Sequence, residues 1–346
     1  MLRPIGRQRQ FRSSASVFPS DCDYTGSSVA PTKTSPRKRG FRKPRSPAAS
    51  ANAWTERTSN GTRILQVPAL NKLPWLVHGF SSRPGGVSAL AGRSAVAEEK
   101  VEQVLNLGFA EWDSRENVLE NRRRFQSALG ARELALVSLK QFHSDVVHVF
   151  ETAPAEPCQG DASATNRPSL LLGVQTADCV PILLVDPRRR AVAAVHAGWR
   201  GTLQRIVMKA IGKMQMEFAT NPADLLAALG PAIGGCCYEV GTEVASAFLA
   251  RFPNAAEWFD ELRTGDEPNP LQWLNMMPPG HQPPAKNVFL DLRKANRAQL
   301  LDAGLSAKNI FVSDLCTACR LDLLFSYRKE GAQSGRLLSV IGIRPS

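Results

Sequence analysis

The fold is decided by two neighbouring apolar runs, SLLLGVQTADCVPILLVD at 169–186 and RRRAVAAVHAGW at 188–199. Near-continuous apolar runs of this kind are typical of strands that are buried on both faces of a sheet. The DPRRR segment that joins them predicts a hairpin-like turn, which makes the two strands antiparallel neighbours. We therefore expect the protein to be built around a buried sheet that contains this pair.

The flanking segments add helices and further strands. GTLQRIVMKAIGKMQMEF predicts an amphipathic helix starting just after Gly201, and EVASAFLARF predicts another after the glycine-rich turn of LLAALGPAIGG. Upstream, AVAEEKVEQVLNLGF and ENVLENRRRFQSALG both have helical periodicity and are each closed by a glycine. This mixed order of strands and helices predicts an α/β fold with at least one antiparallel or mixed sheet.

The net charge of +12 over 346 residues is concentrated near the N-terminus. Residues 1–50 hold eleven basic and two acidic side chains, which leaves only +3 for the remainder. Because a nucleic-acid patch has to belong to the folded surface, this distribution argues against nucleic acid as a partner. We interpret the tail as disordered, with a transit peptide or an RNA-binding arm as alternatives. Deleting residues 1–55 would test the last, since enzymatic turnover should survive and nucleic-acid affinity should not.

The composition also bears on the compartment. No apolar run approaches the roughly 20 residues needed to cross a bilayer, so we expect no membrane span. Seven cysteines are an odd count in a chain of this length, which fits a reducing compartment better than a secreted disulfide scaffold. The N-terminus lacks the apolar stretch and cleavage site of a secretory signal. We expect a cytoplasmic protein, with organelle import as the alternative and no indication of oligomeric state.

Histidine is scarce, with five residues in the chain, and this limits the possible metal sites. Two imidazoles and one thiolate suit Zn²⁺ and leave a fourth position open, as catalytic zinc sites do. Cys179 and His196 lie on the two consecutive strands, and antiparallel pairing could bring them to one ion. His143, at the end of a predicted strand, is the natural third ligand. His148 is left out because it would point to the opposite face of a continuous strand.

Other interpretations of these residues stay open from the sequence alone. Cys179 could be a small buried hydrophobic residue, and a histidine that closes an apolar strand is as often structural. The pair Cys179 and His196 could also form a thiolate and imidazole dyad for nucleophilic catalysis without a metal. Copper is a weaker candidate than zinc because multicopper sites depend on many imidazoles, often as His-x-His pairs, and this chain has no such pair.

The remaining cysteines carry weaker signals. Cys316-x-x-Cys319 has no second CxxC pair, so we interpret it as structural. Cys236 and Cys237 are adjacent in a turn and cannot form an unstrained bridge with each other, so we expect core or loop thiols.

Six blocks of the sequence together resemble the laccase-domain family, which is known as polyphenol oxidase-like and as purine nucleoside phosphorylase. They are HGFSSRPGGVS, LVSLKQFHSDVVHV, GVQTADCVPILLVD, AAVHAGWRGTL, LGPAIGGCCYEVG and LFSYRKEGAQSGR, in the family's order from His78 to Ile343. The resemblance implies a layered α-β-β-α sandwich with mixed sheets. It divides the chain into a basic tail, residues 1–58, and one catalytic domain, residues 59–346.

The resemblance also implies an activity and a metal. Members of the family use zinc and cleave adenosine, guanosine, inosine or methylthioadenosine with phosphate to the base and ribose 1-phosphate, and they can deaminate adenosine. The family's zinc ligands correspond to His143 in QFHSD, Cys179 in TADC and His196 in VHAGW. The segment that follows the GGVS loop departs from the family pattern.

Phosphorolysis requires a bound phosphate near C1′ of the ribose. We expect Arg83 or Arg200 to bind it, together with backbone amides of the helix after Gly201, and Arg328 is a further candidate. Arg83 is singled out because Gly85 and Gly86 free the backbone beside it for contact with an anion or sugar. The predicted partners are therefore purine nucleosides and phosphate.

Overall fold

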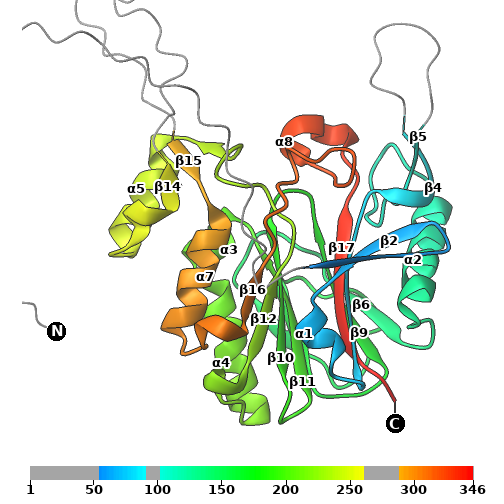
Figure 1. Ribbon diagram of the computed structural model, residues 1–346, viewed down its shortest axis with the longest axis horizontal. Coiled ribbons are helices and arrows are strands. Elements are labelled where there is room, and N and C mark those ends of the chain that lie inside the picture. The colour runs from blue at the N-terminus through cyan, green and yellow to red at the C-terminus, as the bar shows by residue number, and fades with distance from the viewer. Residues whose placement is uncertain (1–53, 91–101, 261–287, 346) are drawn as a thin grey trace, which may run out of the picture. The chain divides into compact units, whose positions relative to one another are not determined.

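The computed structural model describes residues 54–90, 102–260 and 288–345. Two six-stranded sheets form the framework (Figure 1). The first has the order β1 (Thr55–Ser59), β2 (Thr62–Gln66), β3 (Leu76–Ser81), β17 (Leu337–Ile343), β9 (Leu170–Thr176) and β6 (Ala135–Ser138). The second has the order β16 (Ile310–Val312), β12 (Leu226–Leu229), β10 (Val180–Asp186), β11 (Ala191–Ala197), β8 (Ala162–Thr165) and β7 (Val147–Val149).

Both sheets are mixed, as predicted. In the first sheet β6 runs parallel to β9, and the other neighbours are antiparallel. In the second, β16 is parallel to β12 and β7 is parallel to β8, while β10 pairs antiparallel with both β11 and β12. The β10–β11 pair is the predicted hairpin, and its turn over DPRRR is completed by Arg190 at a positive φ of 49°.

The position of strand β10 between two cores explains why the apolar run at 180–185 is continuous. Leu183 and Val185 face a core between the two sheets, which also receives Leu172 of β9 and Ile341 of β17. The alternate residues Ile182 and Leu184 face a second core on the outer side of the sheet. Because successive side chains of a strand point to opposite faces, a strand between two cores has to be apolar at every position.

Helices cover the outer face of each sheet (Figure 1). Helix α2 (Arg115–Leu129) packs Phe125 and Leu129 against the first sheet. It starts at the Ser114 cap and ends at Gly130, whose φ of 62° is the left-handed conformation that glycine adopts without strain. Helices α3 (Trp199–Leu203), α4 (Ile206–Phe218) and α7 (Leu292–Asp302) cover the second sheet. The layers are therefore α-β-β-α, which confirms the predicted sandwich.

The remaining elements are short. They are α1 (Pro68–Asn71), α5 (Thr242–Arg251), α8 (Tyr327–Glu330), the strand pair β4 (Pro84–Leu90) and β5 (Glu102–Val104), and a three-stranded sheet of β13 (Glu239–Val240), β15 (Val288–Leu290) and β14 (Phe259–Asp260). Single 3-10 turns occur at Pro222–Asp224, Ala255–Trp258, Ala307–Asn309 and Gly331–Gln333.

Three local predictions need correction. The helix expected over AVAEEKVEQVLNLGF is strand β5 at Glu102–Val104, because pairing with β4 buries Val104 completely; residues 91–101 lie outside the described residues. The helix expected to start after Gly201 is two helices, α3 with Gly201 inside it and α4 beginning at Ile206. Strand β1 starts at Thr55, inside the expected tail of residues 1–58, because it pairs with β2. Residues 1–53 of that tail lie outside the described residues.

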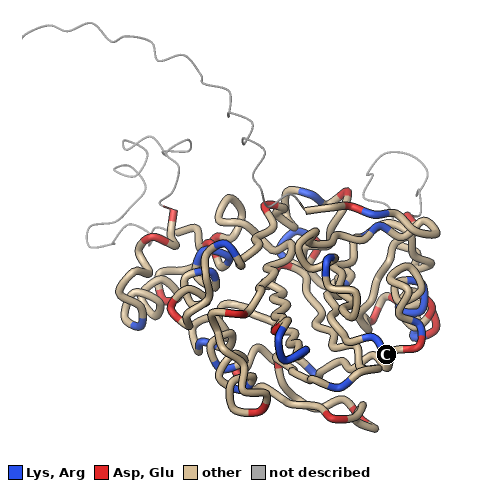
Figure 2. Tube along the Cα trace, turned by 60° about the horizontal axis from the view of Figure 1, so that its bottom comes forward, with Lys and Arg blue, Asp and Glu red and all other residues tan. Residues whose placement is uncertain are grey.

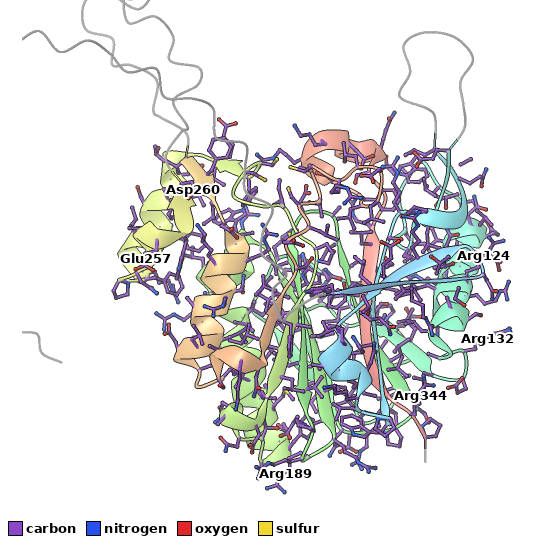
Figure 3. The ribbon with its side chains drawn as sticks, viewed as in Figure 1. Arg124, Arg132, Arg189, Glu257, Asp260 and Arg344 are labelled. Atoms are coloured by element: carbon purple, nitrogen blue, oxygen red, sulfur yellow. The ribbon has the colours of Figure 1, made fainter. Side chains whose placement is uncertain are left out.

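Two general features concern the helices and the charged residues of the described part of the chain. Within residues 54–90, 102–260 and 288–345, no helix combines the length and apolar character needed to cross a bilayer. Basic and acidic residues are both scattered over the described trace (Figure 2). Arg132, Arg189, Glu257 and Asp260 are examples of charged side chains that project from its periphery (Figure 3).

Candidate active site

The β10–β11 hairpin brings Cys179 and His196 together, as predicted. Pro181 pairs with His196 and Val180 with Ala197, so Cys179, one residue before β10, lies beside the end of β11. The residue before it, Asp178, has a φ of 95°, which bends the chain sharply between β9 and β10. The thiol therefore projects from a bend that is fixed on both sides by sheet strands.

His143 reaches the same place from a loop after β6, and Asp161 holds that loop. The buried carboxylate of Asp161 accepts hydrogen bonds from the backbone N–H groups of Phe142 (3.3 Å), His143 (3.0 Å) and Ser144 (2.7 Å), and from the Ser144 hydroxyl (2.6 Å). His143 itself is left-handed, with a φ of 62°. One carboxylate thus sets the position of the histidine through the backbone.

Asp161 also orients His196. Its Oδ1 lies 2.8 Å from Nδ1 of His196, so Nε2 is the nitrogen left for the site. A carboxylate bonded to the far nitrogen of an imidazole is the usual support of a metal-ligating histidine. Asp161 was not predicted, because its signal in the sequence is weak: it is a single acidic residue after Gly160 and before a strand of small residues.

The three predicted ligands have the spacing of a metal site. Nitrogen and sulfur atoms of His143, Cys179 and His196 all lie within 4.8 Å of one another, and Cys179 Sγ is 3.8 Å from His143 Nε2. Zinc bond lengths of about 2.3 Å to sulfur and 2.0 Å to nitrogen put such atoms roughly 3.6 Å apart in a tetrahedral site. The donor set therefore fits one Zn²⁺ with a corner left open.

The charges at the trio suit a cation. Burial would raise the pKa of Cys179, but the neighbouring imidazoles of His196 and His143 outweigh it and lower the pKa to about 6. Burial would lower the pKa of His196, but the Cys179 thiolate and Asp161 raise it to about 9. Burial likewise would raise the pKa of Asp161, and its hydrogen bonds from His196 and Ser144 hold it well below the usual range. These opposite shifts of the two pKa values favour the thiolate form of Cys179 and the imidazolium form of His196 when no metal is bound.

The trio opens into a pocket of about 640 Å³, a size typical of small-molecule sites. Its lining comes from strand ends of both sheets, from helices α3 and α8 and from the loops beside them. It comprises Leu139, Gln141, His143, Gln175, Thr176, Ala177, Asp178, Cys179, His196, Trp199, Arg200, Tyr238, Tyr327, Arg328 and Arg336. The predicted Arg200 and Arg328 are both present. Arg336 and the aromatic residues Trp199, Tyr238 and Tyr327 were not predicted, although each lies in one of the six blocks that resemble the family.

Three arginines of the pocket lie over aromatic rings that also line it, and one of them is Arg336, whose guanidinium is 5.4 Å from the Tyr327 ring centre. The Arg200 guanidinium is 4.7 Å from the Trp199 ring centre, and that of Arg328 is 5.1 Å from the Tyr238 ring centre. The backbone N–H of Arg328 donates to Asp178 Oδ2 at 2.6 Å, which ties helix α8 to the bend before Cys179. Within the described part of the chain, Arg200 makes no ion pair.

The prediction that Arg83 binds phosphate at this site needs correction, because Arg83 does not line the pocket. Its side chain is 2 % exposed and is held by Glu102 at 2.8 Å and by Glu330 at 2.6 Å, with the Phe325 ring beneath it. A guanidinium that two carboxylates already neutralise has a structural role and little attraction for phosphate. The turn of Gly85 and Gly86 instead allows the β4 backbone to approach β5, because a Cβ on Gly86 would lie 2.0 Å from the Val104 carbonyl oxygen.

The expected phosphate contact to amides after Gly201 needs the same correction. The Thr202 N–H donates to the Gly198 carbonyl at 2.8 Å as part of α3, so it is not free for an anion. His148, which was left out of the ligand set, bonds the Gln159 carbonyl through Nε2 at 2.7 Å and stands apart from the trio.

Gly198 provides a direct test of the trio. A Cβ at this position would lie 2.8 Å from His143 Cδ2 and 3.0 Å from Cys179 Sγ. We expect Gly198→Ala to push both ligands aside and to weaken zinc binding at least about tenfold, as for disturbed ligand supports. Gly212→Ala in α4 is the matched control, because its Cβ meets nothing within 4 Å. Zinc affinity measured by chelator competition should fall in the first variant alone; equal affinities would contradict this geometry.

The lowered pKa of Cys179 can be measured in the metal-free protein from the pH dependence of its alkylation. The thiolate should be present above about pH 6 and lost as the pH falls below it, whereas an ordinary thiol needs a pH near 9. The rate of Cys179 alkylation by iodoacetamide, followed on its peptide by mass spectrometry, should therefore have its midpoint near pH 6. His196→Gln should move the midpoint upward because the imidazolium is lost. A midpoint near 9 in the unaltered chain would rule out the thiolate–imidazolium pair.

Comparison with known proteins adds a family and its named relatives. Residues 77–344 match the family model described as "Multi-copper polyphenol oxidoreductase laccase". "Purine nucleoside phosphorylase YlmD" of Geobacillus stearothermophilus is 33 % identical over 279 residues, which cover 78 % of this chain and 94 % of that protein. "Purine nucleoside phosphorylase" of Deinococcus radiodurans is 36 % identical over 289 residues, covering 83 % of this chain and 95 % of the relative.

One relative has a different name. "Adenosine deaminase RL5", from an unknown prokaryotic organism, is 34 % identical over 274 residues and covers 77 % of this chain and 93 % of its own length. Among solved structures, YlmD from Geobacillus stearothermophilus superposes with a TM-score of 0.66 at 28 % identity, over 84 % of this chain and 98 % of that one. The mixed α/β architecture described above is the fold of that structure.

Proposed function

The chain belongs to the multi-copper polyphenol oxidoreductase laccase family, and from that premise we propose that it is a zinc-dependent purine nucleoside phosphorylase. The observation that carries this proposal is the convergence of His143, Cys179 and His196 at one pocket that also presents arginines and aromatic rings. Adenosine, guanosine, inosine and methylthioadenosine are the proposed substrates, with phosphate as the second one.

The arginines supply the phosphate site. Arg200 and Arg328 line the same pocket as the trio, and a guanidinium forms two parallel hydrogen bonds to a phosphate. Arg336 adds a third charge; its Nη1 already donates to the Ser334 carbonyl at 2.9 Å, which fixes its position. Phosphate held here would be ready to attack C1′ of the ribose as the bond to the purine nitrogen breaks.

The aromatic side chains suit the purine. Trp199, Tyr238 and Tyr327 line the pocket, and aromatic faces hold a heteroaromatic base by stacking and by excluding water. Tyr238 is half-buried beneath Arg328, so the base and phosphate sites are adjacent on one wall. Bound zinc would supply Lewis acidity to polarise an oxygen or activate water. His143, Cys179 and His196 hold it, and Asp161 keeps the His196 ring in place.

A deaminase side activity fits the same site. Deamination of adenosine needs an activated water at C6 of the base, and a zinc held by His143, Cys179 and His196 beside the aromatic residues of the pocket would supply that activation. The relative named adenosine deaminase supports this extension.

Copper chemistry of the multicopper kind is less well supported than zinc. It requires several imidazoles in addition to those of the trio. His78 is buried and accepts a hydrogen bond from the Val67 N–H, and His148 bonds the Gln159 carbonyl, so neither adds an imidazole to the site. A blue-copper centre would use two histidines and a cysteine with a distant methionine, and no methionine is among the described residues that line the pocket.

A metal-free hydrolase is the second candidate, because one observation favours it. Cys179, His196 and Asp161 are arranged as nucleophile, base and orienting carboxylate, with a thiolate already formed near neutral pH. The third donor, His143 Nε2 at 3.8 Å from the sulfur, has no role in such a dyad and is explained by a metal.

Metal analysis joined to product detection separates these functions. Protein purified without chelator should contain zinc at the trio and convert adenosine to adenine and ribose 1-phosphate only when phosphate is added. Chelation should stop turnover, and added zinc should restore it. Turnover that survives complete metal removal but stops on alkylation of Cys179 would favour the hydrolase. Inosine that forms without phosphate would report deamination.

Two further expectations remain proposals. We keep a single catalytic domain after the basic tail, with its start moved to Thr55 by strand β1. We also keep the cytoplasm as its compartment, since the six described cysteines are all unpaired thiols.

A further inference from the structure

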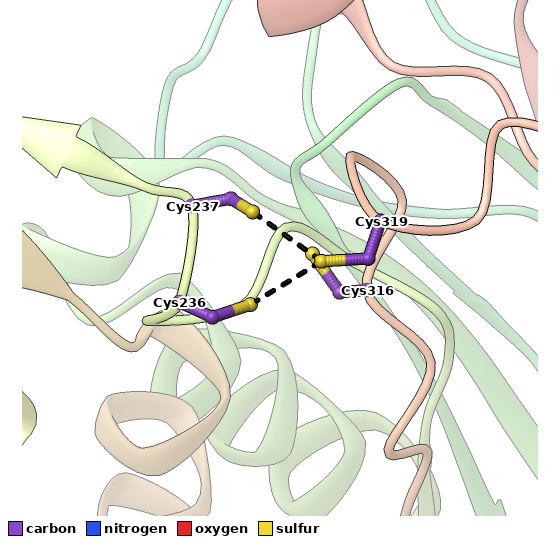
Figure 4. A group of neighbouring side chains, drawn as sticks. All are labelled: Cys236, Cys237, Cys316 and Cys319. Carbon is purple, nitrogen blue, oxygen red and sulfur yellow. Dashed lines mark hydrogen bonds between the residues drawn. The ribbon is translucent and has the colours of Figure 1, made fainter.

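Four cysteines outside the active site form a second cluster. Cys236 and Cys237 lie in the turn after β12, and Cys316 and Cys319 lie in the turn after β16 (Figure 4). All four sulfur atoms are within 4.8 Å of one another. The CxxC pair, which has no second CxxC in the sequence, thus has a partner pair of adjacent cysteines. The parallel pairing of β12 and β16 places the two turns side by side.

The sulfur separations are those of a metal site. Cys319 Sγ lies 3.7 Å from Cys236 Sγ and 3.4 Å from Cys237 Sγ. Four sulfurs at about 2.3 Å from a tetrahedral zinc are about 3.8 Å apart. A disulfide would require about 2.05 Å. The geometry therefore resembles that of four ligands around one ion more closely than that of two bridges.

The backbone is arranged as in thiolate metal sites. The Gly234 N–H donates to Cys316 Sγ at 3.3 Å, a bond that stabilises a sulfur anion. Each pair lies on a tight turn: the N–H of Cys237 bonds the Gly234 carbonyl, and the N–H of Cys319 bonds the Cys316 carbonyl. The turn of Cys316 and Cys319 has the CxxC spacing usual in Cys₄ zinc sites, and the turn of the adjacent Cys236 and Cys237 supplies the other two sulfurs.

We propose that Cys236, Cys237, Cys316 and Cys319 bind one structural Zn²⁺, separate from the catalytic trio. Each thiol gives its proton to solvent as its bond to zinc forms, so four thiolates surround the ion and no electron is transferred. Because the protein supplies all four corners, the site leaves no position for a substrate and is structural rather than catalytic.

The ion would stiffen one wall of the active-site pocket. Thr317, inside the CxxC turn, donates its hydroxyl to Asp178 Oδ1 at 2.6 Å, and the Ile233 N–H donates to the Asp178 carbonyl at 2.9 Å. Asp178 is the residue before Cys179, and Tyr238, next to Cys237, lines the pocket. Both turns that hold the ion therefore contact the bend that presents the catalytic thiol.

Zinc content per chain tests the proposal on the full-length protein, purified with a reductant and without chelator. The unaltered chain should contain two zinc ions, and Cys319→Ser and Cys236→Ser should each contain one. These two cysteines are exposed, so serine buries no new hydroxyl. Cys158→Ser is the matched control, a half-buried cysteine outside both groups, and should keep two. Cys179→Ser should lose the other ion, so failure of either site is seen separately.

Three results would overturn the proposal. They are unchanged zinc in both Cys319→Ser and Cys236→Ser, iron with acid-labile sulfide in place of zinc, and a mass of the freshly purified chain that shows these cysteines joined as disulfides. If both variants fail to fold, cobalt(II) loading of the unaltered chain decides. Absorption from a four-thiolate centre in addition to the trio supports the proposal, and a single one-thiolate centre rejects it.

Discussion

Replacing Cys179 with alanine should abolish phosphorolysis of adenosine and remove the zinc of the trio. The thiolate is the one anionic ligand of the trio, and with its pKa near 6 it is ionised at neutral pH and needs little proton release on metal binding. Alanine would leave His143 and His196 as two neutral donors, which hold zinc far more weakly than three. Turnover should fall to the level of the reaction without enzyme, and zinc content measured by mass spectrometry should drop by one per chain.

Cys158→Ala is the control for this variant. Cys158 is also a half-buried free thiol, and it packs at the edge of the core between the sheets, away from both groups of candidate ligands. It should keep full activity and full metal content. A Cys179→Ala protein that lost the metal and retained full activity would reject the proposed mechanism, and one that retained the metal would reject the ligand set.

The β10–β11 region shows what the sequence could predict. Two uninterrupted apolar runs with a short charged turn between them leave few alternatives to an antiparallel buried pair, and the pair then places Cys179 beside His196. These relations are local, since the residues are close along the chain. The helix predicted over residues 95–109 failed in its described part for the opposite reason. Val104, Leu105 and Leu107 are buried by packing against other segments, and their spacing alone does not distinguish a helix from strand β5.

Long-range pairing explains the other misses. Arg83 looked available because its partner Glu330 is far along the chain, and only the folded protein brings them to 2.6 Å. The two cysteine pairs were judged separately for the same reason, because the parallel contact of β12 and β16 is what joins their turns. Asp161 carried no motif, although it organises the site more than any predicted residue.

Asp161→Asn should therefore be the most damaging conservative change outside the metal ligands. Both carboxylate oxygens act only as hydrogen-bond acceptors. Oδ1 accepts from His143 N and His196 Nδ1, and Oδ2 accepts from Phe142 N and from the backbone N–H and hydroxyl of Ser144. An asparagine has one accepting oxygen, so its NH₂ group would face at least two donors in either orientation. Each buried donor left without an acceptor costs about 1–3 kcal/mol. We expect a stability loss of at least about 2 kcal/mol by denaturant unfolding.

The same change should weaken zinc binding about 10- to 100-fold, because the His196 ring and the His143 loop both lose their support. Asp186→Asn is the matched control: Asp186 is also buried in the second sheet, its Oδ1 accepts from Arg188 N and Arg189 N, and its Oδ2 has no partner, so an amide fits there.

Acid should erase the stability difference between Asp161→Asn and the unaltered chain. The folded pKa of Asp161 is lowered, so its contribution is fully present above the ordinary value of 3.8 and is lost as the pH falls through the folded value. A gap in unfolding free energy that persisted unchanged down to the most acidic pH at which the protein folds would mean that the carboxylate charge does not hold the site together.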